Sequence, residues 1–215
     1  MSNLDNNSKT EELYSMIVGF IESAIKLKNL PRQGWIRVGI PLSVVESVAD
    51  HCYNTAMLSL LLVDLHNELY KDEQLSSELV MRIAIVHDLP ECKYQDFDKQ
   101  VEILVGKDHY LEFKTQILTN ASNELLSLIL NENVKELWRK TLDDVIVKSS
   151  REAKFVSYVD KLEVIVQALA YEKQGYNPRI FDEYWNTSLD YLRSCTFEVI
   201  NNLIPQLKQA RLQNF

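Results

Sequence analysis

The chain has 215 residues, of which only 5 are glycine and 5 are proline. Average soluble proteins contain roughly 7% glycine, much of it in hairpins, bulges and phosphate-binding loops. The low glycine content therefore disfavours turn-rich β structure. With 46% apolar and 25% charged residues, the composition predicts long helices joined by short connections. A chain of this length can bury a continuous core without disulfides or a structural metal.

The charge balance of 23 basic and 31 acidic residues gives a net charge of −8. Proteins that bind nucleic-acid polymers normally carry a basic face, so we expect no such polymer as a partner. The sequence shows no positively charged leader and no apolar run of membrane-spanning length, so we expect neither secretion nor a membrane partner. The three cysteines, Cys52, Cys92 and Cys195, lack CxxC spacing and are expected to be reduced thiols in the cytoplasm, with the nucleus also compatible.

The first predicted helix is followed by an unusual loop. An S-K-T-E pattern at Ser8 resembles a capping box and predicts a helix from about 9 to 28, with apolar residues at helical spacing. The segment LPRQGWIRVGIP then contains two of the glycines and two of the prolines. An exposed loop would not ordinarily carry a tryptophan, so Trp35 is expected either to be pinned onto the core or to line a pocket.

Two further helices are predicted in the first half of the chain, over about 46–69 and 77–89. The second of these is so apolar that we expect it to be buried on most sides. Pro90 lacks an N–H group, and its ring would clash with the carbonyl of Val86. The helix is therefore expected to stop or kink near Asp88 and to restart with Pro90 in a first turn.

The second half of the chain is predicted to be helical as well. Two or three weaker helices are expected over 99–145, and a capping-box pattern at Ser149–Glu152 opens a strong helix over about 150–173. Nothing marks a domain boundary, so we expect one all-α domain over 1–215, with one or two C-terminal helices over 180–215 packed on it. The core candidates in the weaker helices are Ile103, Leu104, Tyr110, Phe113, Ile117, Leu118, Leu125, Leu128 and Ile129.

Three segments contain residues that could bind a metal. His51 lies in a helix whose other inward positions are apolar, and a histidine in that position is most often a core residue. The His87-Asp88 pair ends a buried helix, where a divalent metal would satisfy both groups. Asp160 lies beside an apolar stripe, and periodicity alone leaves open whether it faces the core or water. If it faces inward, two imidazoles and two carboxylates could bind one cation, a set that suits Mn, Fe, Co, Ni or Zn better than Mg or Ca. The other two histidines have polar neighbours and are expected to be solvated.

These residues resemble the H…HD…D signature of the HD-domain metal-dependent phosphohydrolases. The strings RQGWIRVGIPLSVVESVADH, IAIVHDLPECKYQD and EAKFVSYVDKLEVIVQALAYE follow one another within about residues 30–175. In that order they resemble the eukaryotic HD-domain 5'-deoxynucleotidases, which are related to bacterial deoxynucleoside-5'-monophosphatases. The resemblance implies a single-domain helical bundle of the HD-domain type with a metal site in its core. It also implies deoxyribonucleoside 5'-monophosphates as substrates, and it is compatible with a homodimer.

The resemblance assigns roles to individual residues. The residues that would hold one divalent transition metal are His51, His87, Asp88 and Asp160. Glu91 would be the general acid or base, since it can reach over the metal pocket if the turn after Pro90 stays helical. Asp96 matches the position that contacts the sugar.

The loop around Trp35 matches the segment that meets the substrate, with Arg32 as the phosphate ligand. Two departures weaken this match: Arg32 is separated from Trp35 by two residues, so that Arg37 competes for the phosphate role, and Gln95 replaces the usual glycine before the sugar-contacting aspartate. Lys154 is a further candidate for the phosphate, although a solvated helix lysine is the simpler interpretation.

Two other functions remain open at this point. The same site could act on a cyclic nucleotide, an alarmone or another phosphomonoester. A non-catalytic helical binding module could also have kept the fold, although the intact set of histidines, aspartates and Glu91 argues against it.

Overall fold

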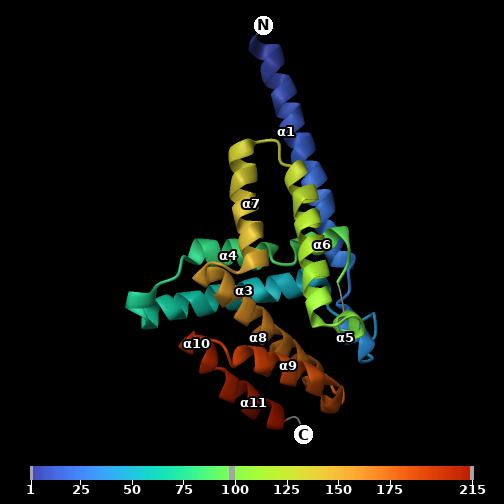
Figure 1. Cartoon of the computed structure of the whole chain (residues 1–215), viewed down its shortest axis with the longest axis vertical. Coiled ribbons are helices and arrows are strands. Elements are labelled where there is room, and N and C mark those ends of the chain that lie inside the picture. The colour runs from blue at the N-terminus through green and yellow to red at the C-terminus, as the bar shows by residue number, and fades with distance from the viewer. Residues whose placement is uncertain (1, 97–99, 214–215) are drawn as a thin grey trace. The chain divides into compact units, whose positions relative to one another are not determined.

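The computed structural model describes residues 2–96 and 100–213, which Figure 1 shows in chain order. Within these ranges the chain is helical, and its only β feature is an isolated antiparallel bridge between Pro31 and Ser47. The prediction of an all-α protein is confirmed. The chain divides into two compact units, Met1–Asp50 with Val86–Val147 and His51–Ile85 with Lys148–Phe215. The single HD domain over the whole chain stays a prediction.

The first unit begins with a helix that is longer than the sequence predicts. Its elements are α1 (Ser2–Ala24), the 3-10 helix η1 (Ile25–Asn29), α2 (Gln33–Arg37), the 3-10 helix η3 (Leu89–Lys93), α5 (Gln100–Val105), α6 (Lys107–Ser127) and α7 (Glu132–Val147). Because α1 runs through Ser8, the predicted capping box there does not start a helix. Phe20 of α1 packs edge-to-face on Trp138 of α7, with ring centroids 4.9 Å apart.

Several apolar side chains that helical spacing assigns to the core of this unit are exposed. They are Leu13, Ile17 and Ile21 on α1, Ile103 and Leu104 on α5, and Phe113 on α6. Tyr110, Leu125 and Ile129 are buried as predicted. Periodicity identifies the apolar face of a helix, but it does not tell whether another element covers that face.

The second unit is organised around α8, a long helix in the C-terminal half of the chain. Its elements are most of α3 (Val48–Leu69), the 3-10 helix η2 (Lys71–Glu73), α4 (Ser77–Val86), α8 (Arg151–Lys173), the 3-10 helix η4 (Pro178–Phe181), α9 (Asp182–Leu192), α10 (Glu198–Asn201) and α11 (Ile204–Leu212). The predicted start of α8 is confirmed, but its cap lies one residue later than the predicted box: the Ser150 Oγ, not Ser149, accepts a hydrogen bond of 2.9 Å from the Ala153 N–H. Both α9 and α11 pack on α8, so the segment holds more helical elements than the one or two expected.

The apolar stripe of α3 is buried as its spacing predicts, and this stripe includes a histidine that we expected to be solvated. His66 is buried, with Nε2 3.0 Å from the Glu73 carbonyl oxygen and its ring against Phe155 and Phe197. The expectation was wrong because the polar residues beside it in the sequence, Asp64 and Glu68, lie on the exposed side of α3, whereas His66 lies on the buried side. On α4, which we expected to be buried on most sides, Val80, Ile83, Ala84 and Val86 are buried, whereas Ile85 is exposed.

Among the residues described, no helix is both long enough and apolar enough to cross a membrane.

Candidate functional site

His87 and Asp88 lie in the turn that follows α4. As predicted, α4 ends at Val86 and a new helical turn, η3, begins at Leu89 with Pro90 in its first turn. The His87 Nε2 lies 3.5 Å from Asp88 Oδ2, and both side chains are partly accessible. The proline therefore places an imidazole and a carboxylate side by side at a helix end.

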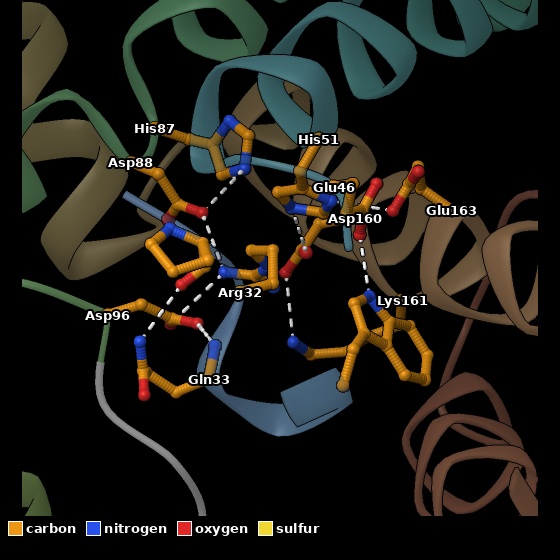
Figure 2. Close-up of polar contacts among 12 residues, drawn as sticks. Arg32, Gln33, Glu46, His51, His87, Asp88, Asp96, Asp160, Lys161 and Glu163 are labelled. Atoms are coloured by element: carbon orange, nitrogen blue, oxygen red, sulfur yellow. Dashed lines mark hydrogen bonds and ion pairs between the residues drawn. The ribbon is translucent and has the colours of Figure 1, made fainter. Parts of the chain in front are cut away.

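Arg32, the N-cap residue of α2, joins two carboxylates of the first unit (Figure 2). Its Nη1 lies 3.5 Å from Asp88 Oδ2 and 3.2 Å from Asp96 Oδ1. Burial by itself would lower the pKa of the Arg32 guanidinium, but Asp96 and Asp88 outweigh it and raise that pKa well above its ordinary value. Arg32 is thus a permanent positive charge held beside Asp88.

Glu91 is a buried carboxyl group in η3. Glu91 is 6% exposed, and its Oε2 has no hydrogen-bond partner among the described residues. Burial is the main cause that raises its pKa well above 4.5, and the carboxylates of Asp88 and Asp96 add to the effect. A carboxyl group with a raised pKa and an unsatisfied oxygen is suited to accept or donate a proton.

Asp96 is held by α2. Its Oδ2 accepts a 2.8 Å hydrogen bond from the Gln33 backbone N–H, in addition to the contact with Arg32. Gln95, which precedes it, has φ of 104°, a left-handed conformation that glycine adopts much more readily. The backbone before Asp96 therefore keeps a glycine-type shape although glycine is absent from the position.

Trp35 is pinned into the core of the first unit. It is 3% exposed, and its indole Nε1 donates a 2.7 Å hydrogen bond to Glu46 Oε1. Of the two expectations for this side chain, the structure agrees with pinning. Arg37 ends α2 and is partly buried. The substrate roles of Trp35 and Arg37 stay predictions.

His51 of α3 is fully buried in the second unit and lies between two carboxylates of α8 (Figure 2). Its Nδ1 is 2.6 Å from Glu163 Oε2, and its Nε2 is 3.2 Å from Asp160 Oδ1. Both ring nitrogens face a carboxylate, and for a neutral ring the shorter contact assigns the proton to Nδ1, which donates to Glu163. Asp160 is partly buried and faces this ring, which answers the question that periodicity left open.

Two residues of this cluster were missed from the sequence. Glu163 is 1% exposed and lies one helical turn after Asp160, among apolar neighbours. A carboxylate inside an apolar stripe, three residues from a candidate ligand, is the signal that would have identified it. Lys161 Nζ lies 3.0 Å from Asp160 Oδ2, whereas Lys154, the lysine named from the sequence, is exposed on α8.

The donor chemistry of both clusters fits a divalent transition metal. With the proton on Nδ1, the His51 Nε2 and Asp160 Oδ1 each present a lone pair, and a cation beside them satisfies both. His87 and Asp88 provide the same pair of donor types in the first unit. Imidazole nitrogen with carboxylate oxygen is a set typical of Zn, Mn, Fe, Co and Ni.

The sequence matches the HD domain family over residues 24–193, a range that includes both clusters. The chain belongs to this family of helical metal-site proteins. It is 30% identical over 199 residues to 5'-deoxynucleotidase HDDC2 of Bos taurus, covering 92% of this chain and 87% of that protein. It is 31% identical to 5'-deoxynucleotidase hdd1 of Schizosaccharomyces pombe, covering 74% and 73%.

A solved structure has the same fold. A conserved hypothetical protein from Pyrococcus furiosus aligns with a TM-score of 0.69 and 28% identity, over 89% of this chain and 99% of that one. The resemblance to the HD-domain 5'-deoxynucleotidases expected from the sequence is therefore confirmed.

Proposed function

We propose that this protein is a metal-dependent 5'-deoxynucleotidase, which removes the phosphate from deoxyribonucleoside 5'-monophosphates. The observation that carries the proposal is the HD pair followed by a buried Glu91, in a chain whose relatives are named 5'-deoxynucleotidases across most of its length. The raised pKa of the Glu91 carboxyl group favours an enzyme over a binding module, because binding alone does not need such a group.

We propose one divalent transition metal, Mn, Co, Fe, Ni or Zn rather than Mg. The ligands we assign to it are His51, His87, Asp88 and Asp160. The support is the family signature together with the nitrogen and oxygen donors of each cluster. When bound, such a metal lowers the pKa of a water molecule and polarises a phosphoryl oxygen.

The chain's own residues would then handle the proton and the phosphate charge. Glu91 as a carboxylate takes the proton of the attacking water, and as a carboxylic acid it returns a proton to the 5'-oxygen of the leaving nucleoside. Arg32 remains cationic throughout and is placed to neutralise the charge of the phosphoryl oxygens. Its ion pairs with Asp88 and Asp96 fix the guanidinium before the substrate arrives.

Recognition of the nucleoside is assigned to the α2 segment and Asp96. We propose that Asp96 contacts the deoxyribose, since it is anchored by the Gln33 N–H and can exclude a 2'-hydroxyl from its surroundings. Arg32 is favoured over Arg37 for the phosphate because of its pairing with Asp88. Trp35 would hold the α2 segment in its conformation. For the phosphate, Lys154 is a weaker candidate than Lys161, because the Lys154 side chain is exposed and Lys161 lies beside Asp160.

The experiment that tests the substrate class is a panel of phosphate-release assays with Mn or Co present. We expect release from dAMP, dCMP and dTMP, and much less from AMP, CMP and UMP. Cleavage of a cyclic nucleotide or an alarmone with all three deoxynucleotides left intact would replace the proposal by the related HD activity. No turnover of any of them would favour a binding module.

We also propose a cytoplasmic or nuclear homodimer that needs neither membrane nor nucleic acid. The three cysteines are buried and form no disulfide with one another, which supports a reducing compartment. The exposed apolar residues Leu13, Ile17 and Ile21 on α1 offer a surface that a second copy could cover. Light scattering after gel filtration should give a dimer mass for the native chain and a monomer mass for a variant with Ile17→Asp and Ile21→Asp.

A further inference from the structure

Glu163 is a buried carboxylate that the proposed reaction does not use. Both of its oxygens are engaged: Oε2 accepts from His51 Nδ1 at 2.6 Å, and Oε1 accepts from Asn54 Nδ2 at 3.3 Å. Glu163 is 1% exposed and His51 is 0% exposed. A carboxylate removed from water this completely is costly, so its hydrogen bonds must hold it in a fixed orientation.

The contact with Glu163 decides which nitrogen of His51 is available to a cation. A neutral imidazole has one N–H donor and one lone pair. Because Glu163 takes the N–H of Nδ1, the lone pair lies on Nε2, which is 3.2 Å from Asp160 Oδ1. The ring cannot rotate to offer Nδ1 instead without breaking a short buried hydrogen bond.

We infer that Glu163 is a positioning residue that fixes the tautomer and orientation of His51 for metal binding. The inference rests on the proposed function, in which His51 is a metal ligand. Glu163 does not touch the metal: it accepts the Nδ1 proton, makes Nε2 a better donor through its negative charge, and is itself oriented by Asn54. Such outer carboxylates typically contribute 10–100-fold to metal affinity.

The chain offers a matched control on the same helix. Glu172 is also a buried carboxylate of α8, but its Oε1 accepts from Trp185 Nε1 at 3.3 Å and from Arg211 Nε at 3.0 Å. Glu172→Gln removes the same charge from the same helix without touching His51. It should lower the stability of the metal-free protein and leave its metal affinity unchanged.

The test is calorimetric titration of the metal-free full chain with Mn²⁺ alone. We expect Glu163→Leu to raise the Kd about 10–100-fold. Glu163→Gln keeps an acceptor for Nδ1 and should cost less. Asn54→Ala, at a partly exposed site that should tolerate it, should raise the Kd several-fold. Circular dichroism checks folding, and if Glu163→Leu does not fold, Glu163→Gln and Asn54→Ala decide the matter.

Three results would overturn the inference. The first is a native Kd for Mn²⁺ in those variants of Glu163 and Asn54 that fold. The second is an equal loss of Mn²⁺ affinity in Glu163→Gln and Glu163→Leu, and the third is a loss of Mn²⁺ affinity in Glu172→Gln as large as that in Glu163→Leu. Failure of the proposed function has a different signature. In that case the native chain binds no Mn²⁺, or His51→Ala binds it with native affinity.

Discussion

At the scale of single residues, the chemistry concentrates on carboxyl groups whose surroundings differ. Glu91 is buried among acidic neighbours with one oxygen unsatisfied, and Glu163 is buried with both oxygens satisfied. The first arrangement raises a pKa and favours proton transfer, whereas the second holds a partner in place. We thus propose two different purposes for the same residue type.

The two roles assigned in the first unit can be separated by substitution. Glu91→Ala should retain the metal but lose turnover by at least about 100-fold, because a proton-transfer group is removed. His87→Ala should lose the metal itself. Metal content by mass spectrometry and phosphate release from dCMP, measured on the same samples, check both. Equal metal loss in the two variants would contradict the division of roles.

The raised pKa of Glu91 also predicts how stability changes with pH in the metal-free protein. The folded state binds the Glu91 proton more tightly than the unfolded state, so the free energy of unfolding falls as pH rises from about 4.5 to the raised pKa. The loss is about 1.4 kcal/mol for each unit by which the pKa is raised. Glu91→Gln removes this dependence.

Urea unfolding of the native chain and Glu91→Gln at several pH values measures the effect. The variant should gain stability over the native protein as pH rises through this window. If the difference in free energy of unfolding between Glu91→Gln and the native protein does not change with pH, the Glu91 pKa is ordinary.

Gln95 occupies a backbone conformation that favours glycine. A non-glycine residue at φ of 104° is strained. Gln95→Gly should relieve the strain and raise the free energy of unfolding by about 1 kcal/mol, after allowance for the greater freedom of glycine in the unfolded chain. Gln95→Ala keeps the strain and should give no gain. Chemical unfolding of both variants makes the comparison, and equal stability of the two would argue against strain at this position.

The candidate site residues that the sequence singles out are those with a pattern of their own. His51, the His87-Asp88 pair, Asp160 and Glu91 follow a spaced signature. The position of Glu163 in an apolar stripe signals a buried carboxylate, but its partner, His51 on another helix, cannot be identified from the sequence. The hydrogen bond between Trp35 and Glu46 could not be predicted for the same reason, because a sequence gives the residues of a segment but not their hydrogen-bond partners.

At the scale of elements, local signals predicted helix ends better than helix burial. Pro90 ended α4 as expected, and Ser150 capped α8. The capping-box pattern was displaced by one residue at α8, where it named Ser149, and it failed at Ser8, because α1 had already begun at Ser2. The apolar stripe of α3 is buried while that of α1 is exposed, and only tertiary contacts distinguish the two cases.

The Ser150 cap gives a prediction at this scale. Ser150→Ala should lower the free energy of unfolding by about 1 kcal/mol, because the Ala153 N–H loses its acceptor. Ser150→Asp, which restores an acceptor, should recover most of the loss. Thermal unfolding monitored by circular dichroism provides the measurement, and no loss in Ser150→Ala would show that the cap does not stabilise α8.

At the scale of the whole molecule, a chain with 5 glycines and a net charge of −8 is proposed to act on an anionic substrate. Such a protein has few glycines for a phosphate-binding loop, so positive charge must come from side chains and a cation. Arg32 supplies one part of that charge within the first unit. The proposed metal supplies the rest.

The dependence of phosphate release on that metal tests the central claim most directly. The protein is treated with a chelator, freed of it, and assayed with dCMP before and after one equivalent of Mn²⁺ or Co²⁺ per chain is added. We predict that release is lost on chelation and restored by the added metal. Release that survives complete metal removal, or no release after metal is restored, would contradict the account.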